Sequence, residues 1–206
     1  MTQFVEIPAS EQSIRQKKAV FGIGINDANY LTKININNKI IVCPYYQKWK
    51  NILLRCYSPK THEKFPTYKE CFVCDEWLTF SNFKSWMEKQ DWQGKHLDKD
   101  LLVQGNKEYS PSKCLFVTPQ INTLLTSRTG GRGEFMLGVY FYKPHGKFRA
   151  KCRCINGGLL HLGYFCSETE AHKAYKKYKY ALIAKIAKEQ EEPLKSALLR
   201  YKIPEY

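Results

Sequence analysis

Residues 147–154 alternate strictly between positively charged and apolar positions. Cationic side chains occupy the odd positions, namely Lys147, Arg149, Lys151 and Arg153, and apolar side chains occupy the even ones. A period of two is typical of a β-strand with one face packed and the other in water. Like charges in a column repel one another, so the pattern favours a polyanion docked on the wet face. The stretch therefore predicts a small sheet that binds nucleic acid.

A further strand is predicted on each side of this one. Residues 139–142 alternate between Val or Phe and Tyr, and a turn at 144–146 follows them. Asn156-Gly-Gly158 is a hairpin signal that requires positive φ, and a third strand is expected at 159–163. The result would be a three-stranded antiparallel sheet. Its exposed face would carry Tyr140, Tyr142, Lys147, Arg149, Lys151, Arg153 and His161.

A long helix is expected after the third strand. Ser167 and Glu170 have the spacing of a capping box, which predicts a helix start at this point. The helix should run to about Lys188, and Pro193 should stop it. Its expected apolar stripe is Ala171, Ala174, Tyr175, Tyr178, Leu182 and Ile186. We expect this stripe to cover the sheet face opposite the cations.

The N-terminal part predicts two short helices and two strands. Strands are expected at 40–43, after a turn at Asn37-Asn38, and at 68–74. The apolar stripes of the helices are Tyr46, Trp49, Leu53 and Cys56 for the first, and Phe80, Phe83, Trp86 and Met87 for the second. At these spacings the aromatic side chains indicate a hydrophobic core. The fold class expected for the whole chain is α+β.

Charge and composition narrow the class of partner. The 206 residues are 43% hydrophobic and 14% aromatic, and they carry a formal net charge of +14. Residues 127–206 hold 16 Lys and Arg against 7 Asp and Glu. A polyanionic partner is therefore expected. No apolar run approaches the roughly 18 residues that span a bilayer, and no signal-peptide core opens the chain. We expect an intracellular protein of the host cytoplasm, without a membrane partner.

A linker is predicted between two domains. Residues 126–134 contain three glycines and small polar residues, which indicates a linker at 127–136 between domains 1–126 and 137–206. Arg128 and Arg132 would let this linker follow a phosphate backbone, or they would decorate a merely solvated hinge.

The C-terminal domain resembles the APETALA2/ethylene-response-factor domain over about residues 137–185. The landmarks, in order, are Gly138-Val-Tyr, Gly146-Lys-Phe-Arg-Ala, Leu162-Gly-Tyr-Phe, Glu170-Ala and Ala174-Tyr175. The resemblance implies that the sheet lies in the major groove of DNA. By position, Arg153 corresponds to a base-contacting arginine of that family, whereas Tyr140 and Tyr142 replace two others. The implied partner is double-stranded DNA, and RNA stays open as an alternative because exposed tyrosines suit unstacked bases.

Residues 40–125 resemble the HNH homing endonucleases of bacteriophages, which have a ββα-metal fold. The motifs are His96-Leu-Asp-Lys-Asp100, Gly105-Asn-Lys107 and Phe116-Val-Thr-Pro-Gln-Ile-Asn122. In that family an aspartate and a later asparagine hold one divalent metal, and a histidine activates water. The resemblance therefore implies Mg²⁺ or Mn²⁺ if the chain is catalytic, with Asp98 as a metal ligand.

Two positions depart from the nuclease pattern. Lys99 stands where the base histidine should be, and Lys113 stands where the metal asparagine should be. His96 and Asp100 each lie two residues from Asp98, so on a strand they could supply the base and the second ligand. The candidate catalytic residues are thus His96, Asp98 and Asp100. The alternative is a DNA-binding regulator on a nuclease-derived scaffold that no longer cuts.

The eight cysteines are expected to be reduced and packed. Cys71 and Cys74 form the only CxxC pair, and no second tight pair completes a zinc site. A structural zinc is therefore not expected. A purely structural protein is a third possibility, although the sequence contains no repeats or heptads to support it.

Overall fold

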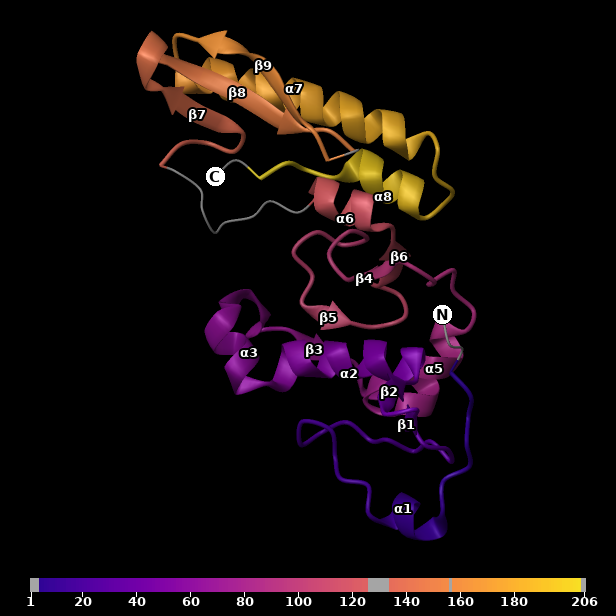
Figure 1. Cartoon of the computed structure of the whole chain (residues 1–206). Coiled ribbons are helices and arrows are strands. Elements are labelled where there is room, and N and C mark those ends of the chain that lie inside the picture. Colours follow the sequence, from indigo (N-terminus) through magenta and orange to yellow (C-terminus); the bar gives the residue numbers. More distant parts are fainter. Residues whose placement is uncertain (1–3, 126–133, 156, 205–206) are drawn as a thin grey trace. The chain divides into compact units, whose positions relative to one another are not determined.

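A computed structural model of the chain describes residues 4–125, 134–155 and 157–204 (Figure 1). Most of the predicted linker, including Arg128 and Arg132, lies outside these described residues, and so does Asn156 of the predicted hairpin turn. The chain divides into two compact units. Unit 1 comprises Met1–Gln93 and Leu97–Phe116, and unit 2 comprises Gly94–His96 and Val117–Tyr206.

Unit 1 is built from short helices and strands. Its first elements are α1 (Glu11–Arg15), β1 (Lys33–Ile36), β2 (Lys39–Val42), α2 (Pro44–Tyr57), α3 (Pro59–Lys64) and a 3₁₀ turn at Pro66–Tyr68. They are followed by β3 (Phe72–Val73), α4 (Asp75–Leu78), α5 (Phe80–Met87), β4 (His96–Asp98), β5 (Glu108–Tyr109) and β6 (Leu115–Val117), of which the end residues His96 and Val117 count with unit 2. The strands pair as an antiparallel β1–β2 hairpin, a parallel β3–β5 pair and a β4–β6 pair.

The core of unit 1 is aromatic. Trp49 of α2 and Trp77 of α4 are fully buried, and the indole nitrogen of Trp49 donates to the Trp77 carbonyl oxygen at 2.7 Å. Phe80, Phe83 and Met87 on α5 pack into the same cluster. The first predicted stripe is therefore confirmed as core, and so is the second apart from Trp86, which is only partly buried.

One local prediction for unit 1 is wrong. The strand expected at 68–74 is reduced to Phe72–Val73, because a 3₁₀ turn takes up Pro66–Tyr68. Pro59 opens α3, where the Ser58 side chain caps the helix by accepting from the Thr61 amide. Proline suits a first helical position.

Unit 2 contains the predicted sheet and helix. After α6 (Pro119–Leu125) come β7 (Val139–Tyr142), a 3₁₀ turn (Lys143–His145), β8 (Lys147–Arg153), β9 (Leu159–Phe165), α7 (Glu168–Ala187) and α8 (Leu194–Arg200). The three strands form an antiparallel sheet in the order β7–β8–β9. The Ser167–Glu170 capping box is present at the start of α7. The three-stranded sheet packed on one helix is therefore confirmed.

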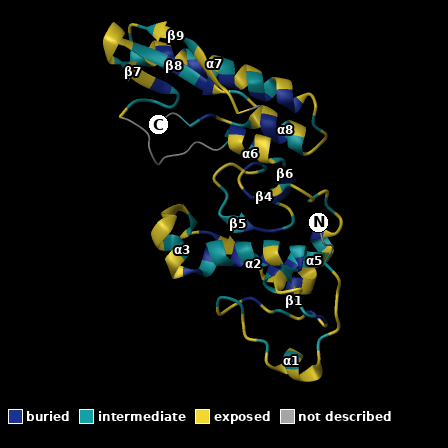
Figure 2. Cartoon of the chain, viewed as in Figure 1, coloured by how far each residue is buried: buried dark blue, intermediate teal, exposed yellow. Residues whose placement is uncertain are grey.

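Helix α7 packs on the sheet with a different stripe from the predicted one. Ala171, Tyr175 and Ile186 are buried as expected, whereas Ala174, Tyr178 and Leu182 are only half-buried. The remaining buried positions are His172, Lys179, Ile183 and Ala187. Figure 2 shows buried and exposed residues alternating along α7, as a helix with one covered face requires. The predicted stripe contained only apolar and aromatic residues, so it did not include the polar residues His172 and Lys179.

The pairing of β8 with β9 contains a β-bulge. Ala150 pairs with Gly163, but the next residue, Lys151, pairs with His161, so β9 has one extra residue at Leu162. Leu162 packs into the core beneath the sheet. Gly163 has φ of +136°, in a region that favours glycine. A glycine inside a strand is therefore explained here by the bulge.

Candidate nucleic-acid interface

The four cations of β8 lie on the sheet face opposite α7. Ala150 and Cys152, which alternate with them, are fully buried, while Lys147 and Arg153 are exposed. Arg149 and Lys151, in the middle of the strand, are half-buried. Within the described residues, none of the four cations forms an ion pair. Their charge is therefore not neutralised inside the protein, which suits a face that meets an external polyanion.

The strand register arranges this face in four rows across the sheet. Tyr140, Arg149 and Tyr164 stand opposite one another on β7, β8 and β9, because Arg149 pairs with both tyrosines. The other rows are Tyr142 with Lys147, Lys151 with His161, and Arg153 with Leu159. Residues paired directly across an antiparallel sheet point to the same face. We call this set, with His145, the basic–aromatic face.

An aromatic cluster occupies the middle of the basic–aromatic face. The ring centroids of Tyr142 and Tyr164 are 5.3 Å apart, and His161 lies 4.7 Å from Tyr164. His145, from the turn after β7, lies 4.8 Å from Tyr164 and 4.9 Å from Tyr142. These distances fall in the range of favourable ring contacts. The cluster therefore contains residues from β7, from the turn that follows it and from β9.

Arg149 is held against this cluster. Its guanidinium carbon lies 4.9 Å from the centroid of the Tyr142 ring, within the range of a cation–π contact. The Nε atom of Arg149 is buried and has no hydrogen-bond partner among the described residues. Stacking thus fixes the plane of the guanidinium group, while its Nε–H group makes no hydrogen bond within the described residues.

The bulge makes the cluster possible. His161 and Tyr164 are three residues apart, so in a regular strand they would point to opposite faces. The extra residue at Leu162 restores His161 to the face that carries Tyr164. Tyr164 and His145 were missed by the sequence reasoning. Gly163 within a predicted strand was the available signal, since an isolated glycine in a strand often marks a bulge.

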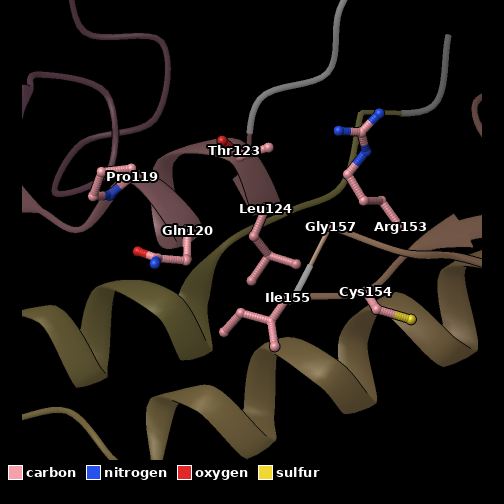
Figure 3. Close-up of a pocket in the computed structure, with 8 residues that line it drawn as sticks. All are labelled: Pro119, Gln120, Thr123, Leu124, Arg153, Cys154, Ile155 and Gly157. Carbon is pink, nitrogen blue, oxygen red and sulfur yellow. The ribbon is translucent and has the colours of Figure 1, made fainter.

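A shallow pocket borders the basic–aromatic face at Arg153. Its volume is about 340 Å³, and its lining residues are Pro119, Gln120, Thr123, Leu124, Arg153, Cys154, Ile155 and Gly157. Figure 3 shows Leu124 of α6 and Ile155, just after β8, facing each other across it. The apolar side chains leave Arg153 as the only charged group of this lining. The pocket therefore adds no charged side chain to the basic–aromatic face beyond Arg153.

The candidate nuclease residues lie in different surroundings. His96 is exposed and belongs to unit 2, where the Asn122 side-chain amide lies 3.1 Å from its Nδ1 atom. Asp98 and Asp100 belong to unit 1. The Asp98 Oδ1 atom accepts from the backbone amides of Asp100 and Leu101, at 2.9 and 2.8 Å. Burial raises the pKa of Asp98, and these two hydrogen bonds oppose the rise.

Lys99 is a buried cation between the two aspartates in the sequence. Its side chain is 8% exposed, and its Nζ atom donates to Asp100 Oδ1 at 2.8 Å and to the Asn106 carbonyl oxygen at 2.6 Å. The Asn106 side chain in turn donates to the carbonyl oxygens of Lys99 and Glu108. The Lys99 ammonium group therefore ties the loop after β4 to the start of β5.

These residues do not fit a divalent metal. Asp98 is engaged as a backbone cap, and Asp100 is neutralised by a buried ammonium group that would repel a second cation. Lys113, at the position of the family's asparagine, pairs with Glu108. Across the part of the chain that the structure describes, no three His, Cys, Asp or Glu side chains form a group that could hold a metal ion.

All eight cysteines are free thiols, and five of them are buried. Burial raises the pKa of Cys56 and of Cys114 to about 12, so both are protonated at neutral pH.

No helix in the described residues is long and apolar enough to cross a membrane. Comparisons with known protein families, curated proteins and solved structures found no match to this chain.

Proposed function

We propose that the protein binds double-stranded DNA through the basic–aromatic face. The observation that carries the proposal is the column of unpaired cations on β8, set on a rigid sheet that is backed by α7. A β-ribbon is narrow enough to enter the major groove. Lys147 and Lys151 would contact phosphates, and the Arg153 guanidinium group has the geometry to donate to a guanine edge. These roles agree with those that the APETALA2-like landmarks imply.

Binding through phosphates should depend steeply on salt. Each neutralised phosphate releases counterions, so the logarithm of the affinity should fall linearly with the logarithm of salt concentration, with a slope of about −0.9 per contact. With four cations on the face, we expect a slope of roughly −3 to −4 for a duplex of arbitrary sequence. Fluorescence anisotropy with a labelled duplex over a range of KCl concentrations would measure it. A slope near zero would contradict the proposal.

We further propose that residues 40–125 form a nuclease-derived scaffold that no longer cleaves DNA. The β4–β6 pair, which α6 follows, and the HNH-like motifs support the origin. The Lys99–Asp100 ion pair supports the loss of activity, because a buried cation stands beside Asp100, the candidate second metal ligand. The chain would then be a DNA-binding regulator rather than an endonuclease.

A plasmid assay separates the regulator from the endonuclease. We expect supercoiled DNA to remain intact with the protein in Mg²⁺ or Mn²⁺, because Asp98 caps two backbone amides and Asp100 pairs with the Lys99 ammonium group. Agarose electrophoresis would follow nicked and linear products. The control is the His96→Ala variant. Cleavage by the wild type that falls in this variant would establish the endonuclease and overturn the regulator.

A further inference from the structure

The basic–aromatic face carries exposed aromatic rings beside its cations, and these rings decide which form of DNA suits it. Tyr140 is 49% exposed and Tyr164 is 37% exposed, so part of each ring is open to a ligand. The exposed cations, Lys147 and Arg153, stand at the two ends of β8. Aromatic rings set among cations are the arrangement that stacks bases while holding the backbone.

Intact duplex DNA cannot use these rings fully. Inside a duplex each base is covered by its neighbours, and a groove offers only base edges and phosphates. Arginine and lysine suit such edges, but Arg149, the central candidate, is stacked on Tyr142 with its Nε atom shielded. The tyrosine rings would gain most from bases whose flat faces are open, as in a gap, a bulge or a single strand.

The spacing of the two exposed tyrosines limits how bases can sit on them. Tyr140 and Tyr164 stand on the outer strands, each directly opposite Arg149. Two strand spacings separate their backbones by about 10 Å. Stacked neighbouring bases are only about 3.4 Å apart. One continuous base stack therefore cannot place adjacent bases on both rings, and the strand must be unstacked to occupy both.

We propose that the basic–aromatic face prefers DNA with unpaired, unstacked bases, and that Tyr140 and Tyr164 are its stacking platforms. This inference rests on the proposed function, since the flanking cations must first hold the backbone. It goes beyond it by naming the form of DNA that binds best. A local opening in a duplex satisfies both requirements, with phosphates for the cations and free base faces for the tyrosines.

The test compares four probes of one sequence: an intact duplex, the same duplex with a short internal gap, the DNA single strand and the matching RNA strand. Anisotropy titrations at one salt concentration give the affinities. We expect the gapped duplex to bind about 10-fold more tightly than the intact one, as one or two stacked bases would give. Tyr164→Leu and Tyr140→Leu should each reduce this ratio, and the double variant should bring it close to 1.

Three variants serve as controls. Phe141→Leu changes an exposed ring on the same strand as Tyr140 but on the opposite face, and should leave the ratio unchanged. Tyr164→Phe keeps the ring, so it should keep the preference even if Tyr164→Leu disturbs the fold. Lys147→Gln should weaken binding to gapped and intact duplexes equally, because it removes only a phosphate contact.

The outcomes are distinct. Equal affinity for gapped and intact duplexes would overturn the inference and leave the proposed duplex binding in place. Absence of binding to every probe would overturn the proposed function itself. Tighter binding to the RNA strand than to the DNA strand would overturn the assignment to DNA, since only a contact to the 2′-hydroxyl distinguishes the two backbones.

Discussion

Replacing Lys147, Arg149, Lys151 and Arg153 together with glutamine should lower the affinity for duplex DNA by about 10³-fold near 0.1 M salt. The same change should reduce the salt slope by about 3 to 4, since each lost cation removes one released counterion. The fold should survive, because all four side chains lie on the face away from α7 and none forms an ion pair within the described residues. Anisotropy titrations at several salt concentrations would measure both quantities.

The matched control removes the same charge from α7. Lys173, Lys177 and Lys185 on that helix and its C-cap residue Lys188 are all exposed, so their replacement with glutamine changes the net charge equally. If binding is localised on the sheet, the helix variant should lose less than about 10-fold. Similar losses in the two variants would mean that the overall charge, and not the basic–aromatic face, drives binding.

Lys99→Ala should destabilise unit 1 by about 2–4 kcal/mol. The change removes two short hydrogen bonds from a buried ammonium group, and it leaves the Asp100 carboxylate and the Asn106 carbonyl oxygen without this partner. It also opens a space beside the ring of Tyr109. All four tryptophans belong to unit 1, so their fluorescence in a urea titration reports the unfolding of this unit alone.

The control for this variant is Lys113→Ala. Lys113 also pairs with a carboxylate of unit 1, that of Glu108, but its side chain is 38% exposed. An exposed pair contributes little, so the loss should stay below about 1 kcal/mol. Equal losses for the two lysines would show that the buried position of Lys99 brings no particular stability. Lys99→Arg, which keeps the charge, should fall between wild type and Lys99→Ala.

Much of unit 2 could be predicted because local signals agreed there. The period-two pattern of β8 and the Ser167–Glu170 capping box each involve residues that are close in sequence, and the structure confirms both. Unit 1 was harder. The stretch 68–74 has strand-forming residues, but only Phe72 and Val73 find a partner strand, at Glu108 and Tyr109. Whether a short segment becomes a strand depends on that distant partner, which its own residues do not encode.

The candidate site was predicted in its cations and in Tyr140, Tyr142 and His161, but not in Tyr164 and His145. Cations on one strand are visible as a pattern, whereas the approach of His145 to Tyr164 depends on a turn and on the other outer strand. In the HNH-like motif, the sequence places Lys99 at the position of the base histidine of the resembled family. Only the folded loop shows its ammonium group engaged by Asp100 and Asn106.

The bulge at Leu162 means that the make-up of the basic–aromatic face depends on the number of residues in β9 as well as on their identity. Deleting Leu162 would keep every aromatic residue in the chain, yet it would shift Leu159 and His161 by one position in the register. A side chain at Gly163 would meet the Phe165 ring at 3.3 Å and would disfavour the φ of +136° that the bulge uses. Leu162 and Gly163, which would not touch DNA, thus set the register of the residues that would. A change in chain length at this point would alter recognition more than many substitutions on the face itself.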